Sequence, residues 1–341
     1  MIKLFFLFLL SISIIFIFKL LCSKFNILVE QSKNNIHKKL LEEEIKKLQI
    51  GGILLFFLTF FQLFDIDIYL ISSLFFILLL GLFSDINLIN SPKLRIILQS
   101  IILIYLVVGS SLFVNETRIS IIDNLIQNNY FQITFTIFCF LVLVNGSNFI
   151  DGVNNLLIIY YLIVTLIVVI TCNSMDINFY LDFFKFLSII LFSLAIFNFL
   201  SYIIMGDSGA YFLAVLMGYF LILLANNNEN ISPIFVLNLL WYPAFENLFS
   251  IIRKLISKNS PSSPDNYHFH HLLFMFINKK FRIHNFGNSL TGILINSYNL
   301  ISLLVASKFA HHTENLSIIL IFNILIYLIF YFFLKNKVKV F

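Results

Sequence analysis

The sequence has 341 residues, of which 60% are hydrophobic and only 11% are charged, and its formal net charge is +5. Soluble domains usually carry about 25% charged residues. The composition therefore excludes a soluble protein and predicts an all-α, polytopic transmembrane helical bundle. With spans of about 20 residues and short connections, a chain of this length fits roughly ten or eleven helices and leaves no room for a soluble domain.

The first segment, 2–22, is apolar apart from two lysines. It lacks a small-residue cleavage site and a strongly basic segment follows, so it is predicted to be a retained span and not a signal peptide. In 24–49, apolar residues recur at helical spacing, and two glutamates precede two lysines by four residues. This pattern is typical of an amphipathic helix on an anionic membrane face, with a solvated charged segment as the alternative.

Ten further apolar segments are predicted to span the membrane, which makes eleven spans in all. They cover 51–64, 68–83, 96–113, 130–144, 153–172, 186–205, 210–225, 231–250, 287–307 and 317–334. If the spans alternate, most Lys and Arg residues fall on one side, so the positive-inside rule predicts an outside N-terminus and a cytoplasmic C-terminus. The chain is then a single membrane domain over 1–341, with cytoplasmic loops near 84–95, 145–155, 206–209 and 251–286.

The loop near 145–155 reads NGSNFIDGVNN. One helix is expected to stop at Gly146 and the next to start after Gly152, and a helix break at a membrane face exposes amides that favour anions. The alternative is that the asparagines only satisfy the backbone at the break. The candidate ligand contacts, several of them three residues apart and so able to face one point, are Asn145, Asn148, Asp151 and Asn154.

Two other loops contribute carboxylates. The segment MGDSGA puts Asp207 between glycines, which let a backbone approach a ligand closely. Asp85 follows the third span, and Lys93 and Arg95 stand at the start of the next one. A carboxylate at a membrane boundary needs a partner, so these residues are candidates for a polar site.

The polar segment 260–273 contains two prolines and three histidines. The prolines disfavour helix until Asp265 or Asn266, either of which can cap a helical turn. Clustered imidazoles bind metal, donate to phosphate oxygens or transfer protons, whereas the alternative is a solvated loop that is rich in histidine. The clustered residues are His268, His270 and His271.

These loops together suggest one chemistry. Asp85, Asp151 and Asp207 come from separate loops and can hold a hard cation such as Mg²⁺, which takes one or two carboxylates together with phosphate oxygens and water. Basic side chains on the same predicted face can neutralise phosphate. They are Lys93, Arg95, Arg253, Lys254 and the three histidines. A diphosphate bound at the membrane surface is the predicted substrate.

The order of these motifs resembles that of the polyprenyl-phosphate N-acetylhexosamine-1-phosphate transferases, membrane enzymes that initiate bacterial lipid-linked glycans. The resemblance extends from His37 to Leu273 and is closer to the O-antigen and enterobacterial-antigen initiators than to the peptidoglycan translocase. The family usually has two adjacent acidic residues where this chain has Ser84 and Asp85. The matching positions are Gly51, Gly52, Gly81, Asp85, Asn145, Asn148, Phe149, Ile150, Asp151, Gly152, Met205, Gly206, Asp207, Ser208, Gly209, Pro243, Glu246, Arg253, Lys254, Ser263, Pro264, Asp265, His268, His270 and His271.

The resemblance implies that undecaprenyl phosphate attacks the β-phosphorus of a UDP-N-acetyl sugar, giving a lipid diphosphate sugar and UMP. It makes Asp207 the expected ligand of Mg²⁺ or Mn²⁺ and Asp151 a second metal or nucleotide contact. It implies that Asp85 orients or deprotonates the acceptor phosphate and that the three histidines contact the diphosphate. Asn145, Asn148, Asn154, Lys93, Arg95, Arg253, Lys254 and Asp265 are the expected substrate contacts.

The same resemblance implies a multi-pass protein of the bacterial inner membrane that starts a glycan such as the O-antigen of lipopolysaccharide. A homodimer is the expected oligomer, and no nucleic acid partner is expected. Two other hypotheses stay open. A secondary transporter would also have broken helices and intramembrane carboxylates, but near the midplane. A binding protein without turnover is suggested by Ser84.

Overall fold

The structure of the chain, a computed structural model, describes residues 2–25, 28–29, 47–64, 66–258, 260, 265–281 and 287–338. In these residues it contains fourteen helices and no strand beyond two isolated bridges at Leu48. This confirms the all-α prediction. Most of the expected amphipathic segment 24–49 and both prolines of the histidine segment lie outside the described residues.

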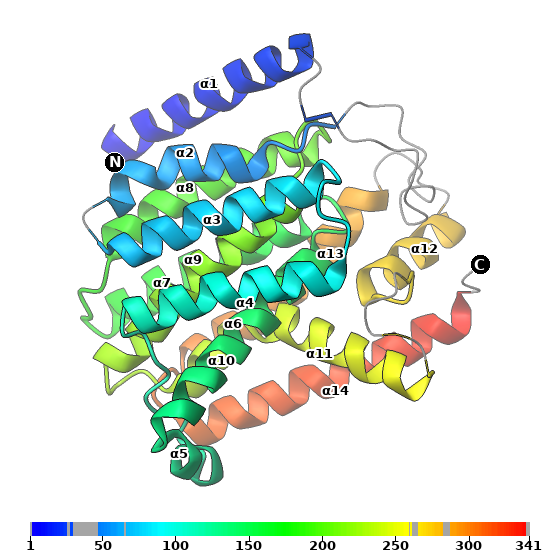
Figure 1. Cartoon of the computed structure of the whole chain (residues 1–341). Coiled ribbons are helices and arrows are strands. Elements are labelled where there is room, and N and C mark those ends of the chain that lie inside the picture. The colour runs from blue at the N-terminus through cyan, green and yellow to red at the C-terminus, as the bar shows by residue number, and fades with distance from the viewer. Residues whose placement is uncertain are drawn as a thin grey trace.

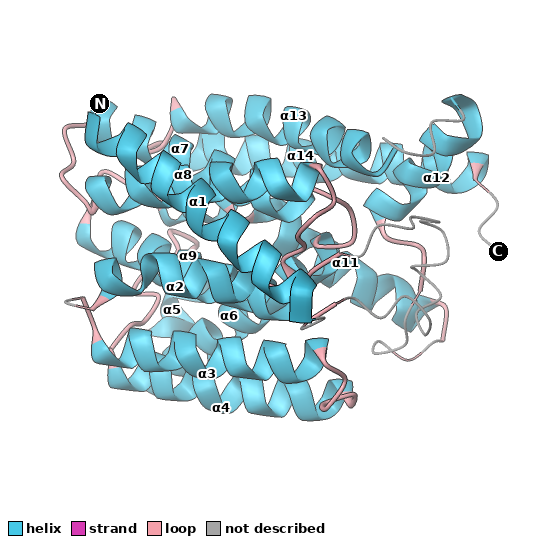
Figure 2. Ribbon diagram, turned by 90° about the horizontal axis from the view of Figure 1, so that it is seen from above, coloured by secondary structure: helices cyan, strands magenta, loops and turns pink. Residues whose placement is uncertain are grey.

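The helices are α1 (Ile2–Phe25), α2 (Gly51–Leu63), α3 (Ile68–Asp85), α4 (Pro92–Gly109), α5 (Ser120–Ile126), α6 (Asn129–Ile150), α7 (Leu156–Ser174), α8 (Leu181–Phe199), α9 (Gly206–Asn227), α10 (Pro233–Leu239), α11 (Trp241–Ile256), α12 (Phe269–Phe281), α13 (Gly287–Ser307) and α14 (Thr313–Lys337). The axes of most of the long helices lie roughly parallel to one another, side by side (Figures 1 and 2). The α3–α4 connection, α12 and the C-terminal end of α14 lie at one end of this stack.

The length and composition of the helices are those of a polytopic membrane protein. Among the described residues, nine helices are long and apolar enough to cross a membrane, and the bent pair α10–α11 gives a tenth candidate. With the shorter apolar helix α2, these elements correspond to the eleven predicted spans. In its most apolar 18-residue window α9 is 83% buried and α1 only 11%, so α9 lies at the centre of the bundle and α1 at its edge.

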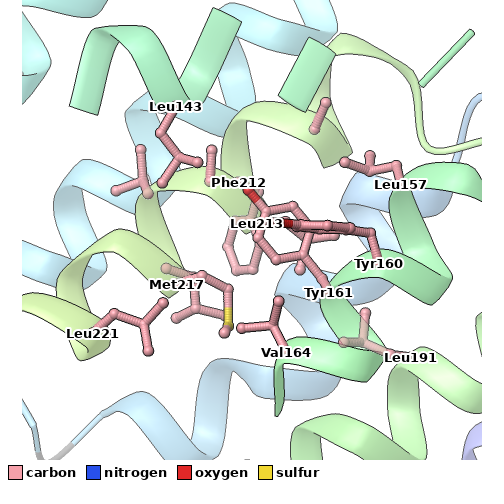
Figure 3. Close-up of a cluster of buried hydrophobic side chains, with 14 of the residues drawn as sticks. Leu143, Leu157, Tyr160, Tyr161, Val164, Leu191, Phe212, Leu213, Met217 and Leu221 are labelled. Atoms are coloured by element: carbon pink, nitrogen blue, oxygen red, sulfur yellow. The ribbon is translucent and has the colours of Figure 1, made fainter. Parts of the chain in front are cut away.

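Apolar side chains of α9 form the middle of the core, where they meet α6, α7 and α8 (Figure 3). Glycines bring α2 and α3 against the first turn of α9: a Cβ at Gly81 would lie 2.3 Å from the Ser208 Cα atom, and one at Gly52 would lie 2.6 Å from the Gly209 nitrogen. No larger residue fits at either crossing. The close contact places the end of α3, with Asp85, beside the start of α9.

Several helix boundaries differ from the sequence prediction, and two of these differences lie at motif or candidate residues. The expected helix end at Gly146 is wrong, because α6 continues to Ile150. Gly146 instead permits a close crossing with α11, where an added Cβ would lie 2.1 Å from the Pro243 carbonyl oxygen. The expected span at 96–113 begins earlier, because Ser91 accepts a hydrogen bond from the Leu94 amide and a proline occupies the first turn of α4.

The predicted span 231–250 corresponds to two helices, α10 and α11. The structure bends by 74° between α10 and α11. Pro243 lies in the first turn of α11, where its missing amide hydrogen costs no helical bond. The bend directs α11 toward the end of the stack that carries α12 (Figure 1). It thereby brings the basic residues in the last turn of α11 close to the histidine segment.

Candidate functional site

A cavity of about 720 Å³ opens at the end of the stack where α3, α6, α9, α11 and α12 meet. Its lining combines acidic, basic and imidazole side chains, and most of the candidate residues from the sequence lie in it. Those that line it are Asp85, Arg95, Asn145, Asn148, Asp151, Asn154, Asp207, Lys254, Asp265, His268 and His271. The structure thus brings together segments that are separated by up to about half of the chain.

Two carboxylates bind the first amides of α9. The Asp207 and Ser208 amides donate to the two oxygens of Asp85, at 2.9 and 3.2 Å, and the Gly206 amide donates to Asp151 Oδ2 at 2.9 Å. The N-terminus of a helix carries unsatisfied amides and a partial positive charge, which favour these anions. Asp85 and Asp151 therefore hold the start of α9, and with it Asp207, at the cavity.

Gly206 is required by this arrangement. Its backbone φ of +68° is one that residues with a side chain rarely adopt. An added Cβ would also lie 2.7 Å from Asp85 Oδ2. The glycine of the MGDSGA segment therefore permits both the turn and the carboxylate contact.

Asp207 takes part in a closed triangle of polar contacts. Its Oδ2 accepts hydrogen bonds from Ser84 Oγ at 2.5 Å and from Arg95 Nη1 at 2.9 Å, and Arg95 Nη1 also lies 2.8 Å from Ser84 Oγ. The two charged side chains are about a quarter exposed to the cavity and solvent. Lys93, in contrast, is exposed and is not among the lining residues. Arg95 is thus the basic residue of this loop that faces the site.

The acidic side chains of the cavity limit which residues could hold a divalent cation. In the described part of the chain, no group of three or more His, Cys, Asp or Glu side chains is arranged to hold a metal ion. Both oxygens of Asp85 are bound to amides, so the remaining acidic candidates are Asp151 and Asp207. One or two carboxylates, completed by water and substrate phosphate, are the usual protein ligands of Mg²⁺.

The three histidines occupy different environments. His268 and His271 line the cavity, whereas His270 is fully buried and is not among the lining residues. A Cβ added to Gly152 would lie 2.3 Å from His270 Nε2, so that ring packs directly against the loop that follows α6. The predicted contact between His270 and a diphosphate is therefore not supported by its position.

Two basic side chains of α11 lie beside the Asp265 carboxylate. Arg253 approaches both of its carboxylate oxygens, at 3.0 and 3.1 Å, and the Lys254 Nζ atom lies 3.8 Å from Oδ2. Burial by itself raises the pKa of Asp265, but the hydrogen bond from Arg253 and the neighbouring positive charges bring it below its ordinary value. Arg253 thus pairs with Asp265, and Lys254 is the basic residue of α11 that lines the cavity.

Some of the asparagines stabilise the fold around the cavity. The Asn154 side chain donates to Ser201 Oγ at 2.7 Å, and its amide donates to Asn288 Oδ1 at 3.1 Å. The Asn145 side chain donates to Gln99 Oε1 at 3.0 Å. These bonds satisfy polar groups between separate segments of the chain. The alternative interpretation expected the asparagines to satisfy only the backbone at the helix break, whereas Asn145 and Asn154 bond to distant side chains and also line the cavity.

Sequence reasoning missed part of the lining. Lys47, which is 8% exposed, was assigned only to the basic amphipathic segment, and Asn247 directly follows the motif residue Glu246. An apolar wall from α4, α6 and α11 also lacked a signal in sequence, apart from the motif residue Phe149, because such residues are common in every span. Its members are Pro92, Ile96, Phe138, Leu141, Val142, Phe149 and Ile251.

Comparison with known proteins identifies one family. The model of glycosyl transferase family 4 matches residues 68–225, which extend from α3 into α9 and include the carboxylates Asp85, Asp151 and Asp207. No curated protein matches the chain.

Proposed function

Since residues 68–225 match the model of glycosyl transferase family 4, we propose that the cavity of this chain transfers an N-acetylhexosamine-1-phosphate group from a UDP-sugar to undecaprenyl phosphate, with release of UMP. The family implies the general activity, which is that of a membrane-bound polyprenyl-phosphate sugar-phosphate transferase. The proposal adds the donor and acceptor, a bacterial inner membrane and the initiation of a glycan such as the O-antigen. The excess of Lys and Arg at the end that carries the cavity favours a cytoplasmic position for it.

The observation that carries this proposal is the division of the cavity into a polar and an apolar part. Lys47, Arg95, Lys254 and His271 supply positive charge or hydrogen-bond donors for phosphate. The apolar wall from α4, α6 and α11 lines the same space. An acceptor with a charged phosphate head and a hydrocarbon tail needs both surfaces at once.

In the proposed reaction an oxygen of the lipid phosphate attacks the β-phosphorus of the UDP-sugar. A new oxygen–phosphorus bond forms, the bond from the β-phosphorus to the bridging oxygen breaks, and UMP leaves with that oxygen. Arg95 and Lys254 would reduce the repulsion between the two anions and stabilise the charge of the transition state. A cation on Asp207 and Asp151, when bound, would add to this stabilisation.

No side chain needs to remove a proton from the acceptor. The second pKa of a phosphate monoester is about 6, so much of the lipid phosphate is a dianion at neutral pH. The amides that bind both oxygens of Asp85 favour a role in positioning α9 over deprotonation. We therefore assign Asp85 to the alignment of Asp207, and we assign Asp207 and Asp151 as the residues that would hold a cation beside the reacting phosphates.

The position of the acids argues against a transporter. Asp85 ends α3, Asp151 follows α6, and Asp207 lies in the first turn of α9, so all three stand at helix ends. A transporter would place its essential acids near the midplane. A relative without turnover is the remaining alternative, because Ser84 replaces a usual acid and contacts Asp207.

The test is UMP release by the purified protein in detergent, with undecaprenyl phosphate, a panel of UDP-N-acetyl sugars, and Mg²⁺, Mn²⁺ or chelator. Asp207→Asn is the test variant. Asp182→Asn is its control, because the Asp182 side chain is fully exposed and is not among the lining residues. Release that requires lipid, one sugar, a cation and Asp207 supports the proposal. Binding of nucleotide without release by any donor refutes it in favour of the inactive relative.

A further inference from the structure

Tyr327 lies in α14, outside the region that matches the family and outside the cavity lining, yet it is connected to His268 through one buried carboxylate. Its hydroxyl donates to Glu246 Oε2 at 2.6 Å, and Glu246 Oε1 lies 2.9 Å from His268 Nδ1. We propose that Tyr327 and Glu246 are positioning residues that fix the ring and the tautomer of His268 in the active site. The catalytic consequence of this positioning rests on the transferase function proposed above.

Glu246 is placed as a pure hydrogen-bond acceptor. Its side chain is buried, with 1% exposure. Besides Tyr327 and His268, the Phe269 amide points to it, at 3.3 Å from Oε1. A hydroxyl and an amide can both donate to a carboxylate, so all of these neighbours suit the ionised form. Such a buried carboxylate is stable only when its oxygens are satisfied.

This acceptor determines which nitrogen of His268 carries hydrogen. A carboxylate cannot donate, so Nδ1 must hold the proton that bonds to Glu246. The other nitrogen, Nε2, is then unprotonated in the neutral ring and lies 3.8 Å from Asp265 Oδ1, at the cavity. The same arrangement orients metal-binding histidines in many proteins, where a carboxylate that accepts from the other ring nitrogen sets the tautomer. Rings of Phe149 and His270, with centroids at 4.9 and 5.6 Å, further limit rotation of His268.

Tyr327 completes this arrangement from a helix that is otherwise peripheral. In its most apolar window α14 is only 22% buried, and it lies at the margin of the bundle below α11 (Figure 1). The Tyr327 ring is held by Phe245 and Phe269, each with a centroid distance of 5.0 Å. Its hydroxyl satisfies the Glu246 oxygen that His268 does not use. Replacement by phenylalanine should therefore remove one hydrogen bond and leave the packing in place.

The first test is spectroscopic and does not need activity. The ¹⁵N NMR spectrum of the detergent-solubilised protein, labelled at histidine, is compared with that of His268→Gln to identify the His268 signals. We expect the neutral His268 ring to be protonated at Nδ1, and the signals to shift toward a mixture of tautomers in Tyr327→Phe. Protonation at Nε2 in the unaltered protein would overturn the proposal, even if the variant failed to fold.

Tyr298→Phe is the matched control. The Tyr298 hydroxyl donates to Asn323 Oδ1 at 2.6 Å, so this variant also removes one hydrogen bond between α14 and a neighbouring helix. It leaves Glu246 untouched, and we expect its His268 signals to match those of the unaltered protein. An equal shift in both variants would show a general effect of loosening α14 and would contradict the positioning role.

The second test is kinetic. Tyr327→Phe is expected to lower kcat about tenfold and to change KM for the UDP-sugar less than about twofold. In a Glu246→Gln background it should cause no further loss, because the two residues act through one contact. Additive losses, or an equal loss in Tyr298→Phe, would refute the coupling. If no donor supports UMP release in any form, the proposed function fails, whereas the NMR result still decides whether His268 is positioned.

Discussion

Replacing Gly206 with alanine is a sharp test of how the carboxylates of the site are aligned. The substitution adds a single methyl group at the turn that precedes Asp207. The methyl carbon would lie 2.7 Å from Asp85 Oδ2 and 2.8 Å from Oδ1, closer than atoms of this kind approach. In addition, the φ of +68° at this position favours glycine. Either the Asp85 carboxylate or the turn must therefore move.

The structure sets the size of the effect. A left-handed conformation costs a residue with a Cβ about 1–2 kcal/mol. If the Asp85 carboxylate moves, its two bonds to the Asp207 and Ser208 amides are also lost, and a hydrogen bond to a charged group is worth about 1.5–3 kcal/mol. We expect Gly206→Ala to destabilise the protein by at least about 1 kcal/mol, and to reduce UMP release more than a hundredfold because Asp207 shifts.

The assay measures melting in detergent and UMP release for Gly206→Ala, Asp85→Ala and the double variant. Truncation of Asp85 removes the carboxylate that the new methyl group meets. The double variant should therefore be more stable than the sum of the single effects predicts. In the Asp85→Ala background, Gly206→Ala should add only the backbone cost of alanine. Unchanged melting and activity in Gly206→Ala would refute the reasoning, as would strictly additive effects.

Three further outcomes are expected. Arg95→Gln should lower kcat for UMP release more than about a hundredfold while it changes stability by less than about 1 kcal/mol, because the Arg95–Asp207 pair is partly exposed and such pairs contribute little to folding. Gly152→Ala should displace His270, whose Nε2 would lie 2.3 Å from the new Cβ, and a lowered melting temperature with lower activity would show it. The pKa of Asp265 is lowered in the folded chain, so the stability advantage of the unaltered protein over Asp265→Asn should be complete above the unfolded pKa of about 3.9 and vanish as the pH falls through the folded pKa. Melting curves between neutral and strongly acidic pH measure this advantage, and an advantage that persists in acid would contradict the ion pairing.

The matched family model agrees with the resemblance seen in sequence because the recognisable signals are local. Hydropathy located the spans, since a membrane requires long apolar helices whatever their neighbours are. Polar residues in short breaks between those spans identified Asp85, Asp151 and Asp207, which do meet in one cavity. These features depend on composition and spacing within single segments.

Contacts between distant segments were decided by the tertiary structure. Sequence spacing treated His268, His270 and His271 as one cluster, but Glu246 and Tyr327 orient the first ring and Gly152 packs against the second. Likewise, Gly146 is a helix breaker by composition but serves as a crossing point for α11.

The sequence by itself determined the membrane-spanning helical class, the order of the helices and the loops that carry chemistry, because each follows from residues that are neighbours along the chain. Only the tertiary structure decided that Arg253 pairs with Asp265 while Lys254 faces the cavity, and that α14 contributes Tyr327. The physical reason is that helix crossings and the α10–α11 bend depend on packing between segments far apart in sequence.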